Sequence, residues 1–110
     1  MIPAERIPRL LGDLVATLDL AADLLARGRS SFDTDPALAL AFEALSNRVG
    51  DLCKQLVAAD PAQFSDQIWS LAARNRDLVV HHYHRISRDL LWNTVSRDFP
   101  ALARLVAKRS

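Results

Sequence analysis

The sequence predicts an all-α protein, a bundle of four to five helices with up-and-down topology. Apolar residues recur at intervals of three and four along most of the 110 residues, the spacing that places side chains on one face of a helix. An aspartate followed by proline, a helix start signal, occurs at Asp35-Pro36 and again at Asp60-Pro61. The strand-like run 78–80 has no second alternating run with which to pair, so we expect it to be a buried helix or the end of a helix.

The first helix is expected from Pro8 to Arg27, with Gly28 as its C-cap. Its apolar stripe comprises Leu10, Leu11, Leu14, Val15, Leu18, Ala21, Ala22 and Leu25. The polar residues 28–35 are expected to form a turn.

A second helix is expected at 36–59. Its apolar stripe has alternating steps of four and three, which predicts close antiparallel packing against a neighbour. The stripe comprises Leu38, Phe42, Leu45, Val49, Leu52 and Leu56. Gly50 inside this helix is expected at a close helix–helix approach.

A third helix is expected to start at Asp60 and to lead, through Phe64, Ile68, Leu71 and Ala72, toward the histidines. Ser87 is the expected N-cap of a fourth helix. Its inward-facing residues should be Leu90, Leu91 and Val95. Pro100 should then open a short terminal helix. Because no long linker or low-complexity tract interrupts the pattern, residues 1–110 are expected to form a single domain.

Charge is distributed unevenly along the chain. Residues 1–66 contain six Lys or Arg and ten Asp or Glu, whereas residues 67–110 contain eight and three. The second part is therefore expected to bind an anionic partner. The single cysteine, Cys53, excludes a disulfide framework within one chain. No apolar run is long enough for a membrane span and the N-terminus lacks signal-peptide order, so a cytoplasmic protein is expected.

All three histidines, at positions 81, 82 and 84, lie in the most basic stretch of the chain. Histidine can exchange a proton near neutral pH, and arginine binds phosphate oxygens in a bidentate manner. Asp77 lies four residues before His81, where a carboxylate can orient the imidazole. The combination indicates phosphate-ester chemistry.

Helix geometry limits how Arg76 and His81 can act together. Five residues along a regular helix correspond to a rise of roughly 7.5 Å and a rotation of about 140°, so the two positions do not share a face. Both can reach one phosphate if the helix ends or distorts between them, if the arginine reaches around, or if a second subunit completes the pair. A metal site of Asp77, His81 and His84 is a weaker alternative, because the neighbouring arginines 76, 85 and 88 would repel a cation.

The segment resembles the HEPN superfamily, and within it the HepT-like toxins. The motif is arginine, a polar residue, three mostly apolar residues, histidine, any residue and tyrosine, and it is filled by Arg76, Asp77, His81 and Tyr83. The resemblance extends to 91–95, to 98–100 and to 48–51, where Asp51 replaces the usual glutamate; Asp77 stands where asparagine is common. Arg74 offers an alternative spacing to His81, so the resemblance leaves the choice between Arg74 and Arg76 open.

The resemblance implies a homodimeric, metal-independent ribonuclease without a cofactor, with both Arg-His pairs in a cleft at the dimer interface. It implies that Arg76 and His81 are catalytic and that Asp77 supports them. Its implied partner is a nucleotidyltransferase antitoxin of the MNT type, which transfers AMP to Tyr83. The candidate RNA contacts are Arg74, His82, His84, Arg85 and Arg88. The alternative function is a non-catalytic nucleotide- or substrate-binding accessory subunit of a nucleotidyltransferase.

Overall fold

The computed structural model of this protein describes the backbone of residues 5–82 and 88–108, and the side chains of 5–74 and 88–108. Every regular element in these ranges is helical, which confirms the predicted fold class. In chain order, the elements are α1 (Arg6–Leu25), α2 (Gly28–Thr34), α3 (Pro36–Ala59), α4 (Gln67–His82), α5 (Arg88–Asn93), the π-helix η2 (Thr94–Asp98) and α6 (Phe99–Ala107).

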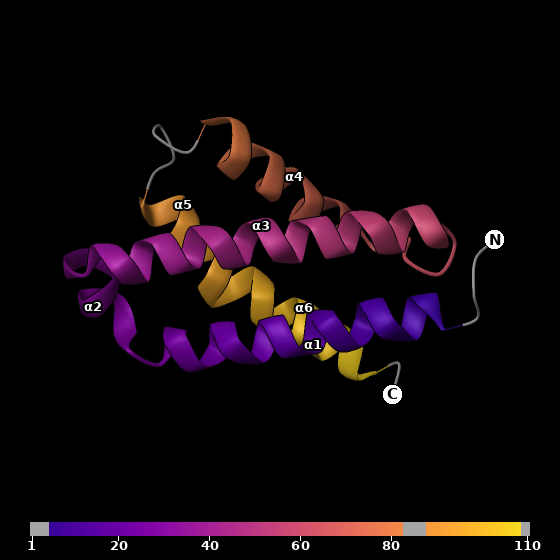
Figure 1. The fold of residues 1–110 in the computed structure, drawn as a ribbon, viewed down its shortest axis with the longest axis horizontal. Coiled ribbons are helices and arrows are strands. Elements are labelled where there is room, and N and C mark those ends of the chain that lie inside the picture. Colours follow the sequence, from indigo (N-terminus) through magenta and orange to yellow (C-terminus); the bar gives the residue numbers. More distant parts are fainter. Residues whose placement is uncertain (1–4, 83–87, 109–110) are drawn as a thin grey trace.

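The central element of the bundle is α3. Helix α1 runs antiparallel to it on one side, α4 packs along another side, and α6 packs against α1 (Figure 1). The contact between α3 and α4 is the most extensive in the described part of the chain. The helix that carries the predicted motif is therefore supported mainly by α3.

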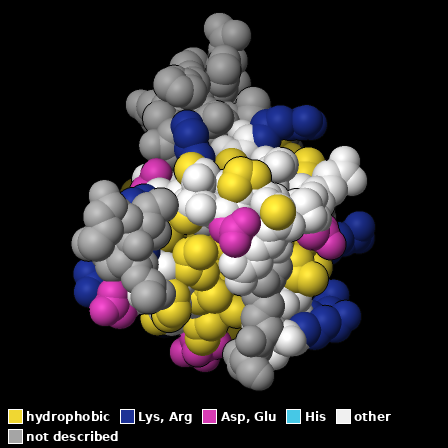
Figure 2. All heavy atoms as spheres, turned by 90° about the vertical axis from the view of Figure 1, so that its right-hand side faces the viewer, with side chains coloured by type: hydrophobic (Ala, Val, Ile, Leu, Met, Phe, Trp, Pro, Cys, Tyr) yellow, Lys and Arg dark blue, Asp and Glu magenta, His cyan; other side chains and the backbone are white. Residues whose placement is uncertain are grey.

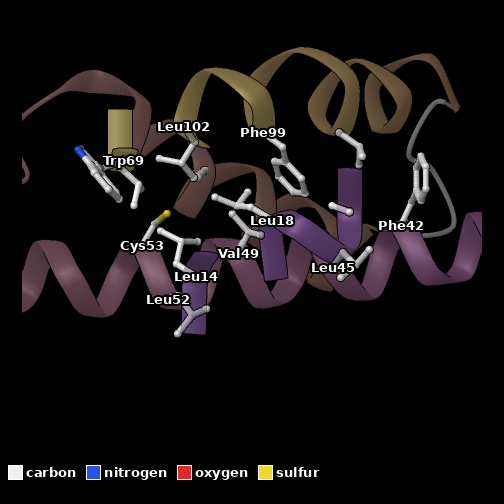
Figure 3. Packing of buried hydrophobic residues seen from close by; sticks show 14 of the residues in the cluster. Leu14, Leu18, Phe42, Leu45, Val49, Leu52, Cys53, Trp69, Phe99 and Leu102 are labelled. Atoms are coloured by element: carbon white, nitrogen blue, oxygen red, sulfur yellow. The ribbon is translucent and has the colours of Figure 1, made fainter. Parts of the chain in front are cut away.

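One hydrophobic core joins α1, α3, α4 and α6. Leu14 and Leu18 of α1, Phe99 of α6 and Trp69 of α4 meet the α3 stripe (Figure 3). All six residues of that stripe are buried, as the heptad spacing predicted: Leu38, Phe42, Leu45, Val49, Leu52 and Leu56. Gly50 is buried as well, and the close helix–helix approach expected there stays a prediction.

Three large apolar residues predicted to face inward are exposed, and so is Ala22, which follows the buried Ala21. Val15, Leu71 and Leu90 expose 41%, 37% and 41% of their surface. Each is next in sequence to a buried residue, and neighbouring residues on a helix point about 100° apart. Only one of each pair can therefore face the core, and the prediction for these residues was wrong.

Residues 28–34 form a short helix, α2, where a turn was predicted. The predicted end of α1 at Arg27 with Gly28 as C-cap was wrong, since α1 ends at Leu25 and Ala26 is its C-cap. Gly28 instead begins α2, with a φ of +88° that glycine adopts without strain. Beyond it, Phe32 is completely buried, and Arg29 pairs with Asp33 one turn later at 2.9 Å. The free energy gained by burying a phenylalanine ring outweighs the low helix propensity of glycine, serine and aspartate. A prediction from local propensity does not include this gain, because the burial depends on tertiary contacts.

The predicted start of α3 is confirmed. The carboxylate of Asp35 accepts a hydrogen bond from the backbone N–H of Ala37 at 3.0 Å, and Pro36 occupies the first helical turn.

The predicted start of the next helix at Asp60 was wrong. Its carboxylate accepts a hydrogen bond from the N–H of Gln63 at 3.2 Å within a single turn. Helix α4 begins only at Gln67, where Asp66 accepts from the N–H of Ile68 at 3.0 Å. An aspartate side chain satisfies the N–H groups of an isolated turn as readily as those of a helix, so the local signal was ambiguous.

The C-terminal helices were predicted as separate but are contiguous, from Arg88 to Ala107. Pro100 lies in the first turn of α6. Proline cannot donate a backbone hydrogen bond, and the wider π-helical turn immediately before it accommodates this loss. The predicted cap, Ser87, lies outside the described residues. None of the helices in the described ranges combines the length and apolarity that a bilayer crossing requires.

Cys53 is expected to be unreactive in the folded protein. Its side chain is completely buried, and burial raises the pKa of the thiol to about 12, because desolvation disfavours the thiolate. Maleimide labelling at pH 8 should be at least about a hundredfold slower in the native state than in urea. Equal rates would show that Cys53 is accessible.

The same raised pKa predicts a loss of stability at high pH. The folded state holds the thiol proton more tightly than the unfolded state, so this contribution is complete below about pH 8.5 and falls as the pH rises toward 12. Between these limits, the unfolding free energy of wild type should fall relative to that of Cys53→Ala by about 1.4 kcal/mol per pH unit. Urea titrations of both proteins at several pH values measure this difference.

Candidate functional site

Arg76, Asp77 and His81 all lie in the C-terminal half of α4. The helix continues without a break from Gln67 to His82, so it neither ends nor distorts between the arginine and the histidine. The two positions are therefore separated by roughly 7.5 Å along the helix axis and by about 140° around it. A phosphate shared by both requires either a long reach of the arginine or a residue from a second subunit.

Arg74 lies one half-turn before Arg76 and is exposed. It borders an open groove of about 510 Å³ between α3 and α4. The residues that line this groove are Lys54, Val57, Ala58, Ser70, Ala73 and Arg74. Arg74 was predicted as a candidate RNA contact, whereas Lys54 was not. Lys54 lies 20 residues before Arg74 in the sequence, so only the antiparallel packing of the two helices brings it to the same groove.

Hydrogen bonds tie the start of α5 to α2. Arg29 donates to Asp89 Oδ1 at 2.6 Å and to Asp33 Oδ1 at 2.9 Å; these two bonds, the first more than the second, raise the pKa of Arg29. Arg88 donates to the backbone carbonyl of Phe32 at 3.2 Å. These contacts fix the position of the start of α5 relative to α2. Arg88 thus has a structural partner, and its contact with RNA stays a prediction.

An aromatic cluster lies beneath these arginines. The ring of Phe32 lies 5.1 Å from that of Phe42 and 5.5 Å from that of Trp92, between centroids. The guanidinium of Arg29 lies 5.7 Å from the Trp92 ring, and that of Arg88 lies 5.7 Å from the Phe32 ring. Trp92 packs against the core and Trp69 is completely buried, so both tryptophans are core residues, as predicted.

The remaining predicted site residues lie between positions 75 and 87, where the structure describes no side chains. The helical backbone of α4 includes Arg76, Asp77, His81 and His82, but the structure does not describe their side chains. Tyr83, His84 and Arg85 lie outside the described residues. Among the described residues, no group of three His, Cys, Asp or Glu side chains could hold a metal ion. The roles of the motif residues therefore remain predictions.

A small helical bundle whose fourth helix carries an arginine and a histidine five residues apart matches the HEPN class of proteins. Comparison with known families agrees: the model of the HepT-like ribonuclease family matches residues 16–109. The chain belongs to the HepT-like ribonuclease family, which confirms the predicted resemblance.

A relative from the curated proteins gives weaker support. A protein of Caldanaerobacter subterraneus subsp. tengcongensis, named "Putative RNase TTE0752", is 28% identical over 75 residues, which cover 68% of this chain and 67% of that protein. No solved structure matches the chain significantly.

Proposed function

We propose that this chain is the toxin of a HEPN/MNT toxin–antitoxin pair, of type II or type VII, and that it acts in the cytoplasm as a homodimeric endoribonuclease that needs no metal ion. Two findings support the proposal. The chain belongs to the HepT-like ribonuclease family, and the matched residues include the whole predicted motif. The relative named as an RNase supports the same activity.

The observation that carries the proposed site is the unbroken course of α4 through Arg76 and His81. One protomer presents these two positions on different sides of the helix. In a two-fold symmetric dimer with the α4 helices facing each other, Arg76 of one protomer can approach His81 of the other, and the symmetry generates two such pairs. The dimer therefore brings together an arginine and a histidine that lie on different sides of the helix within one protomer.

The proposed reaction is an internal transesterification of RNA. His81 takes the proton of a ribose 2′-OH, and the 2′-oxygen attacks the adjacent phosphorus. Arg76 stabilises the negative charge that builds on the phosphoryl oxygens. The bond from phosphorus to the 5′-oxygen breaks, the leaving oxygen takes up a proton from water, and the protonated His81 returns its proton to the solvent. The products are a 2′,3′-cyclic phosphate and a 5′-OH. Single-stranded RNA is the expected substrate, because its flexible backbone permits in-line attack.

The proposed antitoxin is a nucleotidyltransferase of the MNT type that transfers AMP to the hydroxyl of Tyr83. Tyr83 is two residues from His81 in the sequence. An AMP group there would add bulk and negative charge beside the catalytic histidine and would repel the RNA backbone. Modification should therefore abolish cleavage, and mass spectrometry should locate one added AMP on Tyr83.

The test is cleavage of a labelled cellular RNA in EDTA by purified wild type and by His81→Ala. Wild type should cleave and leave 2′,3′-cyclic phosphate ends, and His81→Ala should not. Both proteins are first shown by mass to be unmodified and by circular dichroism to be helical. Absence of cleavage by unmodified wild type would contradict the proposal and favour a non-catalytic subunit of the transferase. Cleavage that EDTA abolishes would contradict the metal-independent mechanism.

A further inference from the structure

The groove between α3 and α4 combines an apolar floor with cations. Val57, Ala58 and Ala73 form the apolar part of its lining, and Lys54, Ser70 and Arg74 provide two positive charges and a hydroxyl group. Lys54 and Arg74 are exposed. A lining of this kind suits a strand with a repeating negative charge and flat or apolar groups between the charges.

No carboxylate lines this groove, and no described carboxylate forms an ion pair with Lys54 or Arg74. Both side chains are exposed, so an external anion can reach them. Four other grooves each include a carboxylate. Asp19 lines both grooves between α1 and α6, of about 260 and 320 Å³. Asp13 and Glu5 each line one of two grooves between α1 and α3, of about 220 and 340 Å³, beside arginines of the same linings. Figure 2 shows hydrophobic, cationic and acidic side chains interspersed at the end of the molecule where α3 turns toward α4. Of these five grooves, the one between α3 and α4 combines cations with a lining free of carboxylates, which fits an anion.

The register of α4 connects this groove to the proposed catalytic histidine. Positions 70, 74, 77 and 81 are spaced by four, three and four residues, so they follow one line along the helix. Seven residues make almost two full turns, which places position 81 roughly 10.5 Å beyond position 74 on the same side of the helix. Arg76 does not lie on this line. The line that forms one wall of the groove thus continues to Asp77 and His81.

We propose that the α3–α4 groove is a binding site for the phosphate backbone of single-stranded RNA, next to the site of cleavage. Lys54 and Arg74 each bind one phosphate, and the apolar floor contacts ribose and base. This inference rests on the proposed ribonuclease function and adds to it a path for the substrate. It also gives the two arginines different roles: Arg74 binds RNA, whereas Arg76 stabilises the reacting phosphate.

The test measures RNA binding without turnover, in the His81→Ala background. A fluorescent single-stranded 20-mer RNA is titrated with the full-length dimer at several salt concentrations. Lys54→Ala/Arg74→Ala should weaken binding about tenfold or more at 0.1 M salt. It should also flatten the plot of log K against log salt by about 1.4, because each lost phosphate contact on a single strand contributes about 0.7. The matched control is Arg97→Ala/Lys108→Ala, which removes one arginine and one lysine from exposed positions elsewhere.

Several results would overturn the inference. One is an unchanged salt slope in Lys54→Ala/Arg74→Ala, and another is an equal loss of affinity in the control variant. A third is a change of molar mass in light scattering, which would assign the groove to a second copy of the chain. Lack of RNA binding by the His81→Ala protein itself would also overturn it. Because binding and cleavage are measured separately, wild type that binds RNA through the groove without cleaving it would contradict only the proposed function.

Discussion

Arg76→Ala protomers mixed with His81→Ala protomers should regain about a quarter of wild-type RNA cleavage, although each variant alone should be inactive. Random mixing makes half of the dimers heterodimers. In a heterodimer, one site combines both substitutions, and the other combines the intact Arg76 of one protomer with the intact His81 of the other. The expectation follows from the continuous course of α4, which separates the two positions by about 140° within a protomer.

Each variant alone should lose about a hundredfold to ten-thousandfold of the cleavage rate constant, since one removes the general base and the other removes stabilisation of the phosphoryl charge. The proteins are mixed by unfolding and refolding together, and heterodimers are isolated by two different affinity tags. No recovery in the purified heterodimer would show that both residues act from the same protomer. Repeating the mixture with Arg74→Ala identifies the catalytic arginine, because only the catalytic one should be inactive alone and complement His81→Ala.

Trp69→Ala should lower the free energy of unfolding by about 3–5 kcal/mol, which is a large part of the stability of a small domain. The Trp69 side chain is completely buried. Its ring packs edge to face against that of Phe64, with centroids 4.9 Å apart and planes at 79°. This contact links the turn before α4 to the first turns of the helix that carries the motif. Truncation would therefore leave a cavity at the base of the motif helix.

Urea unfolding at one fixed protein concentration measures this effect, because the stability of a dimer depends on concentration. Trp69→Phe keeps a ring in the core and should cost roughly 1–2 kcal/mol. Leu71→Ala is the matched control on the same helix, since Leu71 is 37% exposed and should change stability by less than about 0.5 kcal/mol. A similar loss in the Trp69 and Leu71 alanine variants would contradict the assigned packing of α4.

Most of the bundle was predictable, because in a long apolar stripe many residues support the same helix and the same buried face, so that no single residue decides the prediction. The α3 stripe is buried throughout, and Asp35 caps the helix as expected. Short signals were less reliable. Asp60 and Asp35 are both followed by proline, yet Asp60 starts only a turn, and the polar segment 28–34 became helical around Phe32. In both segments, tertiary packing decided between conformations of similar local energy.

By itself, the sequence determined the helical class, the buried face of α3, the family and the spacing of Arg76 and His81, because each of these depends on residues that are near neighbours along the chain. Only the tertiary structure decided that α4 continues through the motif, that α2 anchors the start of α5 and that Lys54 shares a groove with Arg74. The physical reason is the same for the α2–α5 contact and for the shared groove. Helices that pack against each other bring together residues that are far apart in the sequence, and this distance in space cannot be calculated from their separation along the chain. The continuity of α4 likewise has tertiary support, because its most extensive packing is against α3.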